Sequence, residues 1–188
     1  MSRETSLWPG GAKPPACEGC PRAKSGKSFV PGYGELNCRL LWIGEQPGEC
    51  EAGLCSCAPA AHPRLRPFVG KSGKKMDVGI GGSRDGVFIT NVRKCAPPSQ
   101  PETDEEKAAS IDHCVRAYLE PELAAIAEAQ AARGRKRAAI QPIGADATRL
   151  LFGRGNMQRL HGSVFSRAER DAMIAAAAGK SPVEEPDA

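Results

Sequence analysis

The sequence predicts an α/β fold organised around a short parallel central sheet. Three apolar runs rich in branched residues lie at 39–44, 86–90 and 138–144. Each run is too short for a buried helix and ends at a glycine or a polar residue, which is typical of interior parallel strands. Helical segments are expected between and after them, at about 71–78, 103–132 and 146–152. This alternation of strands and helices predicts a layered domain.

Taken in order, the elements bring two polar segments to one edge of the sheet. The first strand ends in Gly-Glu-Gln-Pro-Gly at 44–48, and Asn91 follows the second strand. Pro121 is expected to break or restart the long helical segment at 103–132. Ligands gather beyond the carboxyl ends of parallel strands, so these two segments are expected to share one pocket.

Composition fits one domain with a sizeable core in a chain of 188 residues. The formal net charge is +4, and basic residues cluster at 22–27, 71–75 and 133–137. Each cluster reads either as a solvated loop or as a phosphate-binding surface. The first thirty residues carry no apolar run, so we expect a cytoplasmic protein without a membrane anchor. Its eight cysteines are then expected as reduced thiols with a metal site, not as disulfides.

Four of the cysteines form a candidate metal centre. Cys17 and Cys20 form a C-x-x-C pair, Cys95 follows Asn91 by four positions, and Cys114 lies in a predicted helix. Four thiolates suit either a tetrahedral zinc ion or a four-iron cluster. The cysteine spacing alone does not choose between the two.

Three motifs occur in order along the chain, at 44–48, at 67–73 (Pro-Phe-Val-Gly-Lys-Ser-Gly) and at 89–95 (Ile-Thr-Asn-Val-Arg-Lys-Cys). Together with the four cysteines they resemble the iron–sulfur class, family 4, of uracil-DNA glycosylases, over residues 14–165. The resemblance implies a three-layer α/β/α fold and a monomeric hydrolase that excises uracil from DNA in base excision repair. It also implies a [4Fe–4S] cluster held by Cys17, Cys20, Cys95 and Cys114, with zinc as the alternative.

Two residues match the demands of binding a flipped uracil. The Asn91 side chain carries a donor and an acceptor, so it can meet the O4 and N3–H of uracil and is mismatched by cytosine. Phe68 offers a ring face for stacking, worth ~1–3 kcal/mol. The alternative to base recognition is that Asn91 is a turn or cap asparagine, and the alternative to stacking is that Phe68 belongs to the core.

The remaining candidates belong to the first motif and its continuation. Glu45 could position water or stabilise positive charge on the sugar as a catalytic group, or it could only cap a loop. Gly44 and Gln46 are expected to bind substrate. Glu51 aligns with an acidic position of the family motif, although Ala52 replaces the Asp that usually follows. With Gln46, the loop Gly-Glu-Gln-Pro-Gly is also similar to that of relatives that trap uracil covalently through a histidine in a basic insert. No such insert follows Asn91, so no covalent trap is predicted.

One expected piece is missing from the family pattern, a His-Pro-Ser loop after the last strand. The single His-Pro, at 62–63, comes far too early, so the last edge strand and its loop are expected to be absent. His161 could substitute for the missing histidine. Cys50, Cys55, Cys57 and His62 could form a second metal site. Residues 1–13 are expected to be flexible, and 166–188 to form an Ala-rich helix and then a disordered tail.

Three functions from different classes are therefore compared. The first is a uracil-DNA glycosylase, either fully active or weakened by the missing loop. The second is a non-catalytic protein of the same fold that binds DNA or a partner and keeps a structural metal centre. The third is a cysteine-rich metal-binding protein in which the loop motifs are incidental. The glycosylase is preferred because the three motifs make chemically consistent demands.

Overall fold

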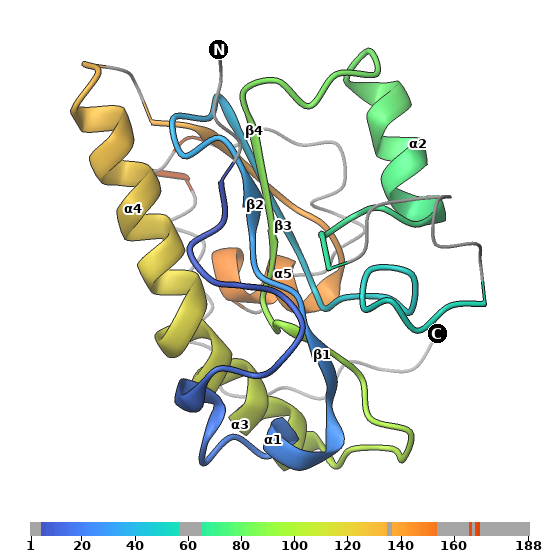
Figure 1. Ribbon diagram of the computed structural model, residues 1–188. Helices are drawn as coiled ribbons and strands as arrows, with labels where there is room; N and C mark the ends of the chain where they lie inside the picture. The colour runs from blue at the N-terminus through green and yellow to red at the C-terminus, as the bar shows by residue number, and fades with distance from the viewer. Residues whose placement is uncertain (1–4, 57–64, 135–136, 154–165, 167, 170–188) are drawn as a thin grey trace, which may run out of the picture.

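A four-stranded sheet with the order β2-β4-β3-β6 forms the centre of the molecule (Figure 1). The computed structural model describes residues 5–56, 65–134, 137–153, 166 and 168–169. The strands are β2 (Tyr33–Gly34), β3 (Leu40–Gly44), β4 (Val87–Asn91) and β6 (Ala139–Pro142). The three predicted strands, β3, β4 and β6, pair in parallel. The two-residue strand β2 pairs antiparallel to β4 and is too short for a sequence pattern to reveal.

Helices cover both faces of this sheet, so the predicted three-layer α/β/α architecture is confirmed. Figure 1 shows α2 on one side of the strands and α4 on the other. Side chains alternate accordingly along β3: Trp42 packs in the cluster with Val87 and Ile89, whereas Leu41 and Ile43 pack in the cluster on the α4 side. The helical elements are α2 (Lys71–Gly79), α3 (Asp104–Cys114), the π-helical turn η3 (Val115–Leu119), α4 (Glu120–Ala131) and α5 (Ala145–Phe152).

The long predicted helical segment is one stack of three helical pieces. It begins at Thr103, whose side chain accepts a hydrogen bond from the Glu106 backbone while the Glu106 carboxylate accepts one from the Thr103 backbone. The π-helical turn follows, and Pro121 then lies in the first turn of α4, where a missing N–H is tolerated. Pro121 therefore lies where the helix restarts, which agrees with the second of the two expectations, a break or a restart.

A second, two-stranded sheet ties the N-terminal segment to the segment that follows β4. Strand β1 (Lys27–Phe29) pairs antiparallel with β5 (Cys95–Ala96). The 3₁₀ turn η1 (Pro15–Cys17) and the short helix α1 (Arg22–Ser25) precede β1. Segment 1–13, expected to be flexible, is held at two of its described positions, by backbone bridges from Thr5 to Gly34 and from Gly11 to Phe29. This arrangement brings the first two cysteines next to Cys95.

Several expectations concern residues outside the described part of the chain. They are the absent last strand and its loop, the substitute histidine His161, and most of the C-terminal tail. In the part that the structure describes, no helix combines the length and the apolar character needed to cross a membrane.

Candidate functional site

Three of the predicted site residues converge at the carboxyl ends of β3 and β4. Gly44 and Asn91 are partners in the parallel register, and Val92 N donates to Gly44 O at 2.8 Å. A β-carbon on Gly44 would lie 2.3 Å from Asn91 Oδ1 and 2.6 Å from the Phe68 ring. Because no side chain fits there, glycine allows the Asn91 amide and the Phe68 ring to approach the strand end together.

Phe68 is held in place by its backbone as well as by its ring. Its φ of 56° lies in the left-handed region, which a bulky residue rarely adopts. Its carbonyl accepts a hydrogen bond from Arg84, which also pairs with Asp77 of α2 at 2.6 Å. The ring packs against Trp42 with 6.5 Å between centroids and 50° between planes. These contacts fix the ring beside Asn91.

Glu51 lies beside the same pair of residues and is 9% exposed. Backbone N–H groups of Phe68 and Gly48 hydrogen bond to its carboxylate, yet burial is the larger effect and raises the pKa of Glu51 to about 6. The Asn91 amide lies beside the carboxylate and also lowers that pKa. Glu51 Oε2 and Asn91 Nδ2 are two of the three described buried side-chain polar atoms that lack a hydrogen-bond partner. The site thus contains a buried donor and a buried acceptor that are both available to a ligand.

Glu45 and Gln46 extend from the same loop toward other elements. Glu45 Oε1 accepts a hydrogen bond from Asp146 N at 3.0 Å, in the first turn of α5. Gln46 Oε1 accepts one from Arg22 Nη1 at 2.9 Å. The hydrogen bond to Asp146 N supports the interpretation of Glu45 as a capping residue. Gln46 is bound by Arg22, a partner that the sequence did not suggest.

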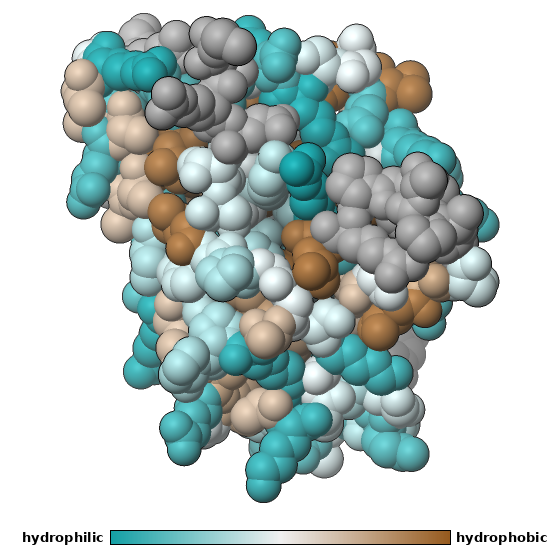
Figure 2. Space-filling view, in the orientation of Figure 1, coloured by the Kyte–Doolittle hydropathy of each residue, from teal (hydrophilic) through white to brown (hydrophobic). Residues whose placement is uncertain are grey.

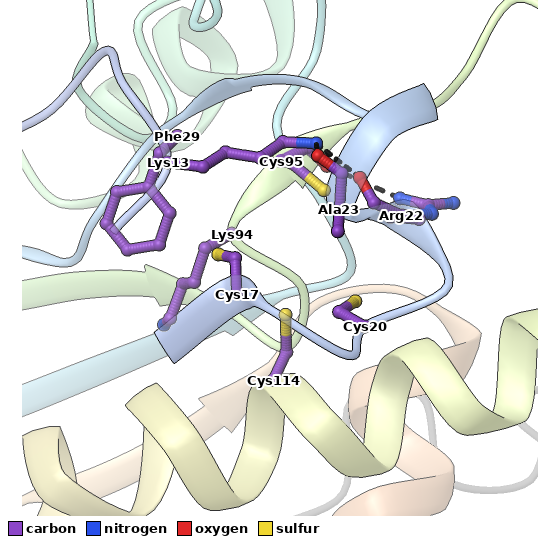
Figure 3. Close-up of a pocket in the computed structure, with 9 residues that line it drawn as sticks. All are labelled: Lys13, Cys17, Cys20, Arg22, Ala23, Phe29, Lys94, Cys95 and Cys114. Carbon is purple, nitrogen blue, oxygen red and sulfur yellow. Dashed lines mark hydrogen bonds between the residues drawn. The ribbon is translucent and has the colours of Figure 1, made fainter. Parts of the chain in front are cut away.

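The four candidate metal-binding cysteines line one cavity (Figure 3). Cys17 comes from η1, Cys20 from the turn after it, Cys95 from β5 and Cys114 from the last turn of α3. A β-carbon on Gly26 would lie 2.7 Å from Cys95 Sγ, so a glycine is needed here as well. The cavity is also lined by Lys13, Arg22, Ala23, Phe29 and Lys94.

The thiols of this cavity differ in their surroundings. All four are free. A hydrogen bond from Cys114 lowers the pKa of Cys20, whereas burial raises the pKa of Cys95. Burial also raises the pKa of Cys17, whose Sγ lies 3.1 Å from the Tyr118 hydroxyl. Cys20 is therefore the thiol of this set that forms a thiolate most readily.

The sulfur atoms line the cavity without meeting at a point. Among the described residues, no three histidine, cysteine, aspartate or glutamate side chains are arranged to hold a single ion. Of the possible second metal site, Cys50 and Cys55 are half-buried, while Cys57 and His62 lie outside the described residues.

A buried network of charged residues links the two sites and was not anticipated. Arg22 pairs with Glu102, and Arg93 pairs with Asp146 at 2.7 Å and with Glu102 at 3.7 Å. Arg93 stands between Asn91 and Cys95 in the third motif, so its burial could have been suspected. Nothing in the sequence around Glu102 or Asp146 indicates that they pair with buried arginines.

The basic clusters divide between the interior and the surface. Arg22, which the sequence placed in a solvated or phosphate-binding run, is 2% exposed, so both expectations are wrong for this residue. Its charge is compensated inside the protein. Lys71, Lys74 and Lys75 are exposed on α2, where Figure 2 shows a hydrophilic surface. These lysines remain available to phosphates.

Comparison with known proteins gives consistent matches. The family model for the uracil DNA glycosylase superfamily matches residues 31–179. The chain is 38% identical over 96 residues to the type-4 uracil-DNA glycosylase of Pyrobaculum aerophilum, covering 48% of this chain and 43% of the relative. It is 39% identical over 100 residues to that of Saccharolobus solfataricus (50% and 42%), and 35% over 105 residues to that of Archaeoglobus fulgidus (54% and 48%). The chain thus spans less than half the length of these three relatives.

Proposed function

Because the chain belongs to the uracil DNA glycosylase superfamily, we propose that it hydrolyses the N-glycosidic bond of uracil in DNA and leaves an abasic site. The observation that carries the proposal is the convergence of Asn91 and Phe68 on Gly44. An amide and an aromatic ring at one strand end are what recognition of a flipped base requires. The proposed partner is DNA that contains uracil, bound by a monomer.

Recognition of uracil is assigned to the unpartnered donor of Asn91. Its Nδ2 can donate to uracil O4 while Oδ1 accepts from N3–H, and cytosine presents the opposite pattern at both positions. Phe68 is proposed as the stacking surface, and Gly44 as the residue whose lack of a side chain lets the Asn91 amide and the Phe68 ring lie together. Glu51 would support both, since its carboxylate holds the Phe68 backbone.

Cleavage requires stabilisation of a sugar that becomes cation-like as the base leaves. Glu45 is the carboxylate proposed for this role, either facing the sugar or orienting the attacking water. Its bond to Asp146 N would set the orientation of the carboxylate. Gln46 is proposed to hold the substrate-binding loop in place from its other side.

The donor set of the cysteine cavity fits an iron–sulfur cluster held by Cys17, Cys20, Cys95 and Cys114. Four thiolates carry a large negative charge, and Lys13, which lines the cavity, would offset part of it, whereas Arg22 and Lys94 are already paired with carboxylates. A tetrahedral zinc ion, with Zn–S bonds of about 2.3 Å, is the alternative occupant of the same four thiolates. When bound, the cluster would cross-link η1, β5 and α3.

The test is uracil excision by the anaerobically purified full chain. A labelled single-stranded oligonucleotide with one uracil is incubated with the protein, and alkali then cleaves any abasic site. Cleavage that is lost in Asn91→Ala, but kept in Arg39→Lys at the opposite end of β3, supports the proposal. An oligonucleotide with thymine in place of uracil is the substrate control. A folded protein that contains iron but leaves uracil in place would favour the non-catalytic DNA-binding alternative.

A further inference from the structure

Arg22 is a buried cation that lines the cysteine cavity and also contacts the loop of the base site. Its guanidinium binds the Glu102 carboxylate through Nε and Nη2, and this ion pair offsets the cost of burying the charge. That hydrogen bond lowers the pKa of Glu102, so the carboxylate stays ionised. The two-point contact leaves Nη1 free to serve another purpose.

The remaining nitrogen, Nη1, bridges the two sites. It donates to Gln46 Oε1 at 2.9 Å and to the carbonyl oxygen of Cys95 at 3.3 Å. Arg22 and Cys95 also line the same cysteine cavity. One planar group therefore connects α1, the loop after β3 and a cysteine of the metal cavity.

Arg22 contacts the loop after β3 from one side, through Gln46. Its other side is fixed to the segment after β4, by Val92 N to Gly44 O at 2.8 Å and by Arg93 N to Glu45 O at 2.9 Å. Gln46 follows immediately and is held by Arg22. A shift of Arg22 would therefore move the loop that lines the base site.

We propose that Arg22 is a positioning residue that couples the cysteine cavity to the base site through Gln46. The inference rests on the proposed function, because it concerns how tightly uracil-containing DNA is bound. Arginine is required for this role, since a lysine ammonium is a point charge that cannot hold the Glu102 fork and Gln46 at once. Displacement of Cys95 would then reach the base through the same guanidinium.

A double-mutant cycle tests the coupling. Arg22→Lys, Gln46→Ala and the double variant are compared for binding to a fluorescent single-stranded oligonucleotide with one uracil, measured by anisotropy, and for KM and kcat. Each single variant should weaken binding and raise KM about tenfold, as expected for a lost hydrogen bond to a charged group, with a smaller change in kcat. The double variant should be no worse than either single one.

Two controls keep the cycle interpretable. Arg39→Lys makes the same chemical change at an exposed arginine and should bind as the wild type does. If Arg22→Lys does not fold, Glu102→Gln takes its place in the cycle, because it loosens the guanidinium without removing it. Iron content per chain and visible absorption report directly on the cysteine cavity in every variant.

The possible failures are distinguishable. Additive effects, near a hundredfold in the double variant, or wild-type binding by Arg22→Lys would overturn the coupling while leaving the glycosylase proposal intact. A wild type that binds the uracil and thymine oligonucleotides equally, and excises neither, would overturn the proposed function and this inference with it.

Discussion

Lys94 and Glu122 form an ion pair with 2.7 Å between Nζ and Oε2, and each side chain is 1% exposed. The same ammonium donates to the carbonyl oxygen of Asn91 at 2.8 Å. The second carboxylate oxygen, Oε1, accepts a hydrogen bond from Gly32 N at 2.8 Å. The backbone of the proposed base reader is therefore held from behind by a fully buried salt bridge.

Glu122→Gln should destabilise the protein strongly. It leaves the Lys94 charge buried without a carboxylate, which typically costs about 3–5 kcal/mol. Urea denaturation measures the difference in the free energy of unfolding. Glu128→Gln, an exposed change on the same helix, should stay within about 0.5 kcal/mol of the wild type. Equal stability of the two variants would mean that the buried pair is not a structural requirement.

Gly44→Ala should abolish uracil recognition with a moderate loss of stability. The added methyl group would overlap Asn91 Oδ1 and the Phe68 ring, and overpacking of this kind costs about 1–3 kcal/mol. Excision should fall at least ~100-fold, by analogy with the loss of one precisely aimed polar group. Gly48→Ala is the matched control in the same loop, since its β-carbon would meet no atom within 4 Å. Similar activity of the two variants would contradict the arrangement.

Phe68→Leu should weaken binding of uracil-containing DNA by about 5- to 150-fold, because base–aromatic stacking contributes ~1–3 kcal/mol. The substitution conserves most of the volume, so folding should change by less than about 1.5 kcal/mol. Anisotropy titration gives the affinity, and thermal unfolding gives the stability. Ile89→Leu repacks the same buried cluster without removing a ring and should bind normally. Unchanged binding by Phe68→Leu would assign the ring to the core alone.

Glu51 should make the free energy of unfolding fall as the pH rises, as expected for a buried acid with a raised pKa. Its pKa is raised from 4.5 to about 6, so the folded state holds the proton more tightly than the unfolded state. This contribution is fully present below pH 4.5 and is lost as the pH rises through 6. At pH 7, Glu51→Gln should therefore be more stable than the wild type by about 2 kcal/mol, and the difference should vanish near pH 4.5.

Denaturation curves from pH 4.5 to 7.5 check this expectation. A constant gap between wild type and Glu51→Gln at all pH values would mean that the carboxyl does not titrate in this range.

The sequence by itself determined the elements whose patterns are local. The apolar runs at 39–44, 86–90 and 138–144 became β3, β4 and β6. Burial on both faces explains the composition of β3 and β4, whereas β6 is a mostly exposed edge strand of the described sheet, so the expectation of an interior strand is wrong for it. The helical segment expected at 103–132 became α3, η3 and α4, with Pro121 in the first turn of α4, for equally local reasons. The ordered motifs also indicated which residues to compare, and the structure brings Gly44, Phe68 and Asn91 together.

Only the tertiary structure decided the pairings between residues far apart in the chain. Strands β1, β2 and β5 are two or three residues long and exist because of their partners, so no periodicity marks them. A basic run predicts an exposed charge for Arg22, but Glu102, eighty positions later, makes its burial possible. Lys94 finds Glu122 in the same way. Whether a charge lies in water or inside the protein depends on the partner that the fold brings to it, and local sequence does not contain that information.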